Sequence, residues 1–219
     1  MDFTVPTDFV DVPIGIGLDE ARAEVNIRNA HPSLAVDEEH QTLSEMAQAL
    51  HQVSCLLSEV GVVYAASCLR TIAGEPSQGT LAVAITDFPY GDDVTVAARG
   101  TLRGVLKSRG AGWSGTVIEI PCGTAAIFTG GQSFTLPATL SYVGEDVEVP
   151  TAQFHAVIPV APIATADRRL MCLIAFATPN VKHWDGHYAR MMAEVLRSLH
   201  FVGVTANDGI AQDDDSRVG

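Results

Sequence analysis

The chain has 219 residues, of which 47% are hydrophobic and 18% are charged. This composition excludes disorder as the dominant state and predicts one core that buries roughly 70% of the unfolded surface. Thirteen Lys and Arg stand against 26 Asp and Glu, which gives a formal net charge of −13. Because such a charge repels phosphate backbones and anionic lipid, we expect neither nucleic acid nor a membrane as a partner.

We expect no secretory targeting signal at the start of the chain. Residues 1–12 (MDFTVPTDFVDV) contain no Lys or Arg and no apolar run long enough for a signal peptide or a membrane span. We therefore predict a cytoplasmic protein. The chain has four cysteines without CxxC spacing, and we expect them to be reduced thiols in or beside apolar segments (Cys55, Cys68, Cys122 and Cys172).

The first quarter of the chain predicts a short strand and two helices. Residues 9–16 alternate loosely and end in glycines, as a strand before a turn does. A helix is expected over 18–29, and His31, Pro32 and Ser33 separate it from a second helix over 37–60. The second helix has an apolar stripe that we expect to share one face (Leu43, Met46, Ala47, Leu50, Val53, Leu57 and Val60).

A hairpin and a third helix follow. Gly61 ends the second helix, and strands are predicted over 62–72 and 80–88 with turn residues at 74–77. Asp92 and Asp93 introduce a helix that continues to about residue 108. Its inward residues should be Val94, Ala98, Leu102, Val105 and Leu106.

The second half of the chain consists mostly of strands and one closing helix. Strands are predicted over 116–120, 124–128, 135–143, 153–160 and 170–177. Thr178, Pro179 and Asn180 have the character of a helix start. The helix behind them places its apolar residues in one broad stripe, so it should lie on a sheet (Trp184, Tyr188, Met191, Met192, Val195, Leu196 and Leu199).

Together these elements predict an α+β fold with a twisted, mainly antiparallel sheet and helices on both faces. We expect one domain over residues 1–205. Residues 206–219 include Asp213, Asp214 and Asp215 and few apolar groups, so we predict a disordered acidic tail there.

The order of the elements resembles that of the PsbP-like fold group, which includes the Ran-binding Mog proteins and mycobacterial lipoproteins of the LpqN type. Within it the chain is most similar to small proteins of high-GC bacteria, in the segments FVDVPI, GVVYAA, PCGTAAIF and AFATPN…HW…SLHF between residues 9 and 201. The resemblance implies an α/β/α sandwich that serves as a binding or assembly module, and it assigns no catalytic residue. The signal peptide and lipidated cysteine of the lipoprotein members are missing from this sequence.

Two motifs suggest cofactors and are better explained otherwise. Gly110, Gly112 and Gly115 satisfy GxGxxG, but they end a predicted helix and enter a strand, which is the reverse of a dinucleotide-binding turn. His183 and His187 are spaced i, i+4 as zinc ligands on one helix can be, but Asp185 projects away from them and no HExxH glutamate is present. We therefore predict plain loop glycines, solvated histidines, no cofactor and no metal.

His51 and Cys55 form the one candidate nucleophile pair. Their i, i+4 spacing would let an imidazole activate a thiol, and Cys55 falls on the polar face of its helix. No third orienting group or oxyanion hole can be identified from the sequence, and cover by the first helix explains Cys55 equally well.

A row of basic residues marks the outer face of the third helix. Arg99, Arg103 and Lys107 align there, with Arg109 at the helix end. In an acidic protein this row is a candidate docking site for an acidic partner or an anionic ligand, and an ordinary solvated face is its alternative. Trp113, Phe134 and Tyr142 are candidates for an apolar rim beside it or for core positions.

The sequence thus favours a non-catalytic protein-interaction or assembly module, with secretion as one candidate pathway. Its partner-binding residues would be Arg99, Arg103 and Lys107. Two alternatives stay open, namely a small-ligand-binding protein with a cavity between sheet and helix, and a cysteine-dependent enzyme that uses Cys55 and His51.

Overall fold

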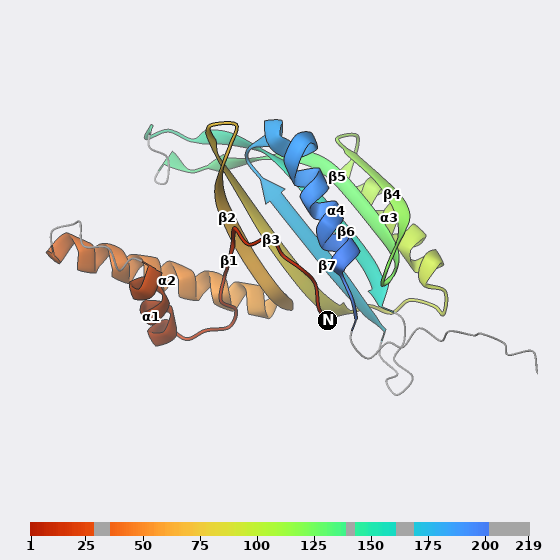
Figure 1. The fold of residues 1–219 in the computed structure, drawn as a ribbon, viewed down its shortest axis with the longest axis horizontal. Helices are drawn as coiled ribbons and strands as arrows, with labels where there is room; N and C mark the ends of the chain where they lie inside the picture. The colour runs from red at the N-terminus through yellow and green to blue at the C-terminus, as the bar shows by residue number, and fades with distance from the viewer. Residues whose placement is uncertain (29–35, 139–142, 161–168, 202–219) are drawn as a thin grey trace, which may run out of the picture.

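A computed structural model describes residues 1–28, 36–138, 143–160 and 169–201, with the helix backbone alone for 36–41. Its described residues form one seven-stranded antiparallel sheet in the order β1-β2-β3-β7-β6-β5-β4. Strand β7 therefore pairs with β3 on one side and β6 on the other, and it joins two groups of sequence-adjacent strands. Helices cover both faces of this sheet (Figure 1), as the sequence predicts for an α+β fold.

The elements follow the sequence closely in number and order. The strands are β1 (Phe9–Asp11), β2 (Val62–Ile72), β3 (Glu75–Asp87), β4 (Trp113–Ile120), β5 (Gly123–Leu136), β6 (Val147–Val160) and β7 (Leu170–Thr178). The helices are α1 (Leu18–Arg28), α2 (Val36–Glu59), α3 (Val94–Arg109) and α4 (Ala189–Ser198), and two shorter turns precede α4, the 3-10 helix η2 (Val181–His183) and the π-helix η3 (Trp184–Tyr188).

Several predicted boundaries were wrong. Strand β1 stops at Asp11, and β3 begins at Glu75, inside the predicted turn. The predicted strands 124–128 and 135–143 are not separate, because residues 123–136 form the single strand β5. Within it a Cβ added at Gly130 would lie 2.5 Å from Cδ2 of Trp113. This glycine is thus explained by the close approach of an indole ring and not by a turn.

The predicted start of the closing helix was also wrong in detail. Asn180 makes no side-chain capping bond. Its Oδ1 instead accepts from the backbone N–H of Gln78 (2.9 Å), and its Nδ2 donates to the carbonyl of Pro76 (3.2 Å). The side chain therefore ties the end of β7 to β3, and the chain passes through η2 and η3 before α4 begins.

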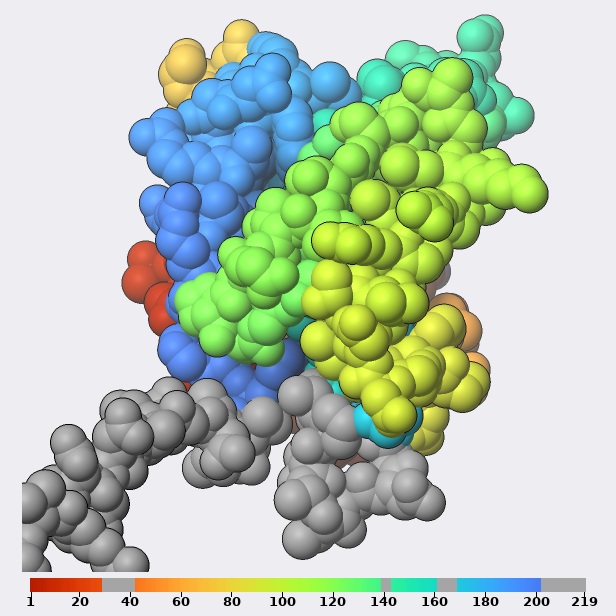
Figure 2. All heavy atoms as spheres, turned by 90° about the vertical axis from the view of Figure 1, so that its right-hand side faces the viewer, coloured from red at the N-terminus to blue at the C-terminus, as the bar shows by residue number. Residues whose placement is uncertain are grey.

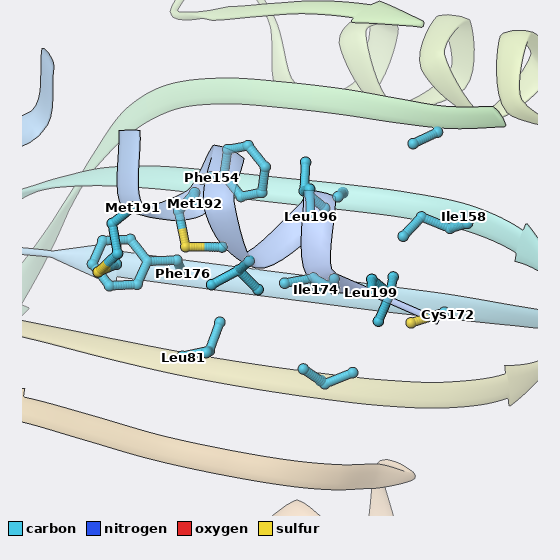
Figure 3. Packing of buried hydrophobic residues seen from close by; sticks show 14 of the residues in the cluster. Leu81, Phe154, Ile158, Cys172, Ile174, Phe176, Met191, Met192, Leu196 and Leu199 are labelled. Carbon is cyan, nitrogen blue, oxygen red and sulfur yellow. The ribbon is translucent and has the colours of Figure 1, made fainter. Parts of the chain in front are cut away.

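The front face of the sheet, defined as the face that carries α4, holds the main core. Side chains from β3, β6 and β7 point at the buried stripe of α4 (Figure 3). The predicted stripe is confirmed, because Met192, Val195, Leu196 and Leu199 are all buried against the strands. Burial of each such side chain contributes about 1.5–3 kcal/mol.

The back face of the sheet carries α3 over its β4–β5 end, where α4 and α3 lie on opposite sides of the strands (Figure 2). Ala98 of α3 is fully buried there against Phe128 and Val157, with Leu102 and Val105 half-buried beside it. The predicted limits of this helix are confirmed by its caps. Asp93 accepts from the backbone N–H groups of Thr95 and Val96, and Gly110 with φ 83° closes the other end.

Helices α1 and α2 pair with each other and extend beyond the sheet as an arm (Figure 1), here called the α1–α2 arm and defined as Leu18–Arg28 with Val36–Glu59. The apolar stripe predicted for this helix is only partly buried, because Met46, Val53 and Val60 are exposed. Ala47 alone of the predicted stripe is fully buried. Amphipathicity shows which side of a helix is apolar, and here little of the sheet reaches that side.

Candidate functional site: the open back face

The middle of the back face lies open between the C-terminal half of α2 and helix α3. A groove of about 350 Å³ runs there between α2 and the strands. Four alanines from adjacent strands make up much of its floor, with polar side chains at Thr80, Gln153 and His155, and Val53 and Leu57 of α2 form one wall (alanines Ala65, Ala82, Ala175 and Ala177). The register places Ala65, Ala82 and Ala175 side by side across three strands. Alanines leave the floor shallow and apolar, so the groove suits a ridge of side chains from outside.

A second groove of about 760 Å³ runs along α3 on the same face. Ala97, Gly100, Thr101 and Gly104 line it from the helix, and Tyr90 lines it from the segment that follows β3. Both helical glycines would have room for a Cβ, since no other atom lies within 4 Å of it. The small side chains expose the helix backbone, which allows another chain to approach closely.

The predicted basic row lies beside this second groove. Arg99, Arg103 and Lys107 are all exposed, and their i, i+4, i+8 spacing puts them on one side of α3. The structure thus brings these three residues together, as the sequence predicts. Their role in binding a partner stays a prediction.

Arg109 belongs to a different arrangement, which connects α3 to the groove floor. Its guanidinium lies 4.8 Å from the ring centroid of Trp113, and that ring lies 5.3 Å from the ring of His155 on β6. Burial lowers the pKa of His155, and the positive charge of Arg109 lowers it further. The Nε2 of His155 donates to Oε1 of Gln153 (3.3 Å). Trp113 is therefore a half-buried support of the back face.

Large apolar side chains are exposed on the elements that border the grooves. Leu69 on β2 is 76% exposed, Leu56 on α2 and Val60 directly after it are 60% and 67% exposed, and Val96 on α3, which lines the second groove, is 63% exposed. Single exposed apolar residues are ordinary, but apolar residues exposed beside two grooves point to an interaction surface. Of the other predicted rim residues, Phe134 is exposed at the far end of β5, and Tyr142 lies outside the described residues.

A polar cluster on the front face is the second candidate. The guanidinium of Arg70 on β2 pairs with the carboxylate of Asp8 (2.5 Å) and donates to Nε2 of His187 in η3. It also lies 5.6 Å from the ring centroid of Phe9 and 5.8 Å from that of Tyr188. A guanidinium can only donate, so Nε2 of His187 carries no proton. Burial lowers the pKa of His187, and the charge of Arg70 lowers it further.

The groups of this cluster are bound to one another and not presented to a ligand. The hydroxyl of Tyr188, a fully buried residue, lies 2.7 Å from the hydroxyl of Ser77. Within the described part of the chain, Nε of Arg70 and Nε2 of His183 are buried without a hydrogen-bond partner. The cluster fastens η3 to β2 and to the segment before β1, and we assign it a structural role.

His183 and His187 are both half-buried, so each remains partly exposed to solvent, and the Nε2 of His187 is bonded to Arg70. No group of three or more His, Cys, Asp or Glu side chains with metal-binding geometry occurs within residues 1–28, 42–138, 143–160 and 169–201.

His51 and Cys55 are close, but the contact between the imidazole and the thiol is long. Nδ1 of His51 donates to the carbonyl of Ile16 (2.9 Å), so the nitrogen left to accept a proton from Sγ of Cys55 is Nε2, which lies 4.0 Å from the sulfur. A catalytic role of this pair stays a prediction. The two grooves of the back face are lined by neither residue. All four cysteines are free thiols, and Cys68 and Cys172 are buried.

The glycine motif has the reversed order that the sequence indicates. Gly110 caps the C-terminus of α3, and Gly115 lies inside β4. A Cβ added at Gly115 would lie 2.7 Å from the carbonyl oxygen of Ile127. Close strand pairing and a helix end therefore explain these glycines, and no helix N-terminus is present to hold a pyrophosphate.

Comparisons with known proteins add no relative. A scan against protein-family models, a search of curated proteins and a search of solved structures each gave no match. Among the described helices, none combines the length and the hydrophobicity that a membrane span requires.

The sequence analysis missed the groove floor. The signal was present as alanine at alternate positions of two strands, Ala82 with Ala84 and Ala175 with Ala177. Alternation of small with large side chains gives one face of a strand to a core and the other to something that approaches closely. What the sequence could not show is that β3 and β7 lie side by side, which places the two alanine pairs together.

Proposed function

We propose that this chain is a non-catalytic protein-interaction module whose docking surface is the back face of its sheet, between the α1–α2 arm and α3. The observation that carries the proposal is the pair of grooves on this one face, with Val96 exposed in one of them and Leu56, Val60 and Leu69 exposed on or directly beside the bordering α2 and β2. A surface of this kind loses unfavourable contact with water when a partner covers it. We place this activity in the cytoplasm, in keeping with the sequence prediction.

The basic row favours one orientation of a partner bound to this surface. Arg99, Arg103 and Lys107 lie along its α3 border, and positive charge at the border of an interface steers an acidic partner and fixes its orientation. The absence of a convergent nucleophile, base and acid at the back face favours binding over chemistry. Within the described residues, the one candidate thiol and imidazole pair lies away from the two grooves.

The test is affinity capture from native lysate of the source organism, followed by cross-linking of the captured complex. Wild type is compared with an Arg99→Glu, Arg103→Glu, Lys107→Glu variant and with a front-face control, Lys182→Glu, Arg190→Glu, Arg197→Glu. We expect a stoichiometric partner on wild type and on the control, with cross-links to α2 and α3, and loss of that partner from the α3 variant. Capture that is equal for all three folded proteins, or cross-links confined to α4, would refute the proposal.

A further inference from the structure

The open back face is bordered at its two ends by elements of opposite charge. The α1–α2 arm stands at the β2 end and holds eight acidic residues, three in α1 and five in α2, against two arginines in α1. Helix α3 stands at the β4–β5 end and holds four basic residues and no acidic residue (Arg99, Arg103, Lys107 and Arg109). The same face thus offers both halves of a complementary pair.

The arm also offers an apolar ridge. Met46, Val53 and Leu56 of α2 and Val60 directly after it recur at spacings of seven, three and four, so they lie on one side of the helix, and all four are exposed. Gln52 and Glu59 flank this ridge and are exposed as well. Twenty-four residues make α2 about 36 Å long, and only its C-terminal part reaches the sheet (Figure 1).

Helix α3 has the reciprocal pattern. Gly100 and Gly104 form a depression beside Val96, within the groove of about 760 Å³. The basic row borders this depression. A ridge of medium-sized side chains, flanked by polar Gln52 and acidic Glu59, fits a trough of small residues with a basic flank in shape and, at Glu59, in charge.

The positions of α2 and α3 allow two copies to form both α2–α3 contacts at the same time. Both helices lie on the back face, at opposite ends of the strand order β1-β2-β3-β7-β6-β5-β4. If two copies face each other across a twofold axis parallel to the strands, the β2 end of each stands opposite the β4–β5 end of the other. Each acidic arm then meets a basic α3, and the contact is made twice, as an isologous interface requires.

We propose that the partner of the back face is a second copy of this chain, docked so that α2 of each copy packs on α3 of the other. This inference rests on the proposed function of the back face and names its partner. The net charge of −13 repels two copies in most orientations, so an encounter is favoured where acidic and basic surfaces meet. Two α2–α3 contacts and the groove between them offer enough length for an interface of about 1,200–2,000 Å².

The test measures the oligomeric state of the full chain by sedimentation equilibrium at protein concentrations from about 1 to about 100 µM, a range that covers the dissociation constants of weak specific dimers. The acidic variant carries Arg99→Glu, Arg103→Glu and Lys107→Glu. The basic variant carries Gln48→Lys, Gln52→Lys and Glu59→Lys, all at exposed positions of α2. The control variant carries Lys182→Glu, Arg190→Glu and Arg197→Glu on the front face, and circular dichroism confirms that each variant is folded.

We expect wild type and the control to dimerise. Each back-face variant alone places like charges opposite each other, so its dimer should be weaker by at least about 100-fold. An equimolar mixture of the acidic and basic variants restores opposite charges at both α2–α3 contacts. That mixture should recover a dimer containing one copy of each variant.

Two results would overturn the inference. One is a wild-type chain that remains monomeric at about 100 µM, because its self-association would then be weaker than that of a specific dimer. The other is a dimer that both back-face variants leave intact. The proposed function survives either result if a different protein is captured in the lysate experiment and cross-links to α2 and α3. If that capture fails as well, the proposed function falls together with the inference.

Discussion

The two faces of the sheet differ in what covers them. On the front face α4 lays a continuous buried stripe on β3, β6 and β7, and Phe176 and Tyr188 are in ring contact at 5.0 Å. On the back face α3 covers only the β4–β6 end, and the strands between α3 and α2 carry alanines. The difference predicts that the front face contributes more to stability than the back face, whose middle is left uncovered.

The largest effect should come from removing an aromatic ring of the front core. Phe176→Ala deletes a side chain that is 1% exposed and that touches Phe9, Trp184 and Tyr188. We expect the free energy of unfolding to fall by about 3–5 kcal/mol, measured by urea denaturation. The back-face control Leu69→Ala should change it by less than about 0.5 kcal/mol. Similar losses for both variants would contradict a division between a stabilising front face and an open back face.

Adding a methyl group should have opposite effects on the two faces. At Gly79 the new Cβ would lie 2.6 Å from Cζ of Phe176, so Gly79→Ala should cost about 1–3 kcal/mol. At Gly100 no other atom lies within 4 Å, and alanine has the better helix propensity, so Gly100→Ala should stabilise the chain by up to about 1 kcal/mol. Thermal unfolding of both variants at low protein concentration measures the two signs. A loss of stability in Gly100→Ala would show that α3 is already covered.

One histidine on each face should make stability depend on pH. The pKa values of His187 on the front and His155 on the back are both lowered in the folded state, mainly by burial. As pH falls, the two histidines are protonated in the unfolded chain before they are protonated in the folded chain. The contribution of the neutral histidines to the stability of the folded state is therefore complete above about pH 6.5 and declines below it. We expect denaturation midpoints to fall between pH 7 and 5, and a smaller fall in His187→Gln and in His155→Gln. An unchanged slope in both variants would assign the pH dependence to other groups.

The reaction rates of the cysteine thiols should differ between the front core and the rest of the protein, and measuring them requires no substitution that changes stability. Burial raises the pKa of Cys68 and raises that of Cys172 to about 12, and both thiols lie in the front core. We expect iodoacetamide at pH 7.5 to modify half-buried Cys55 on α2 well before either of them, followed by mass spectrometry. Rapid modification of Cys172 in the native protein would show that α4 opens from the sheet.

The sequence predicted what depends on local pattern. The period of apolar residues identified α4 and its buried side, and Asp93 and Gly110 marked the ends of α3. Pattern failed where a distant segment decides the outcome. Two strands were predicted where β5 is one, because nothing nearby in sequence shows that Trp113 occupies the space that a side chain at Gly130 would fill.

The candidate site was predictable to a smaller extent. Helix spacing alone aligned Arg99, Arg103 and Lys107, and the structure keeps them together on an exposed side. The apolar border of the groove could not be predicted, because whether α2 is covered depends on where the arm leaves the sheet. The cluster of Asp8, Arg70 and His187 was missed for the same reason, since three segments far apart in sequence form it. The likeness to the PsbP-like group stays a prediction.

The position of β7 has a consequence for biosynthesis. This strand follows the other six in the chain, yet it lies in the middle of the sheet between β3 and β6. Until it leaves the ribosome, β1–β3 and β4–β6 are two separate sheets, each with a long edge whose backbone groups lack their final partner. Such edges invite pairing with other nascent chains. A chain released from a ribosome that stalls before residue 170 would therefore hold two half-sheets with exposed edges that are prone to aggregation. Chaperones that recognise exposed strands should associate with this protein late in its translation.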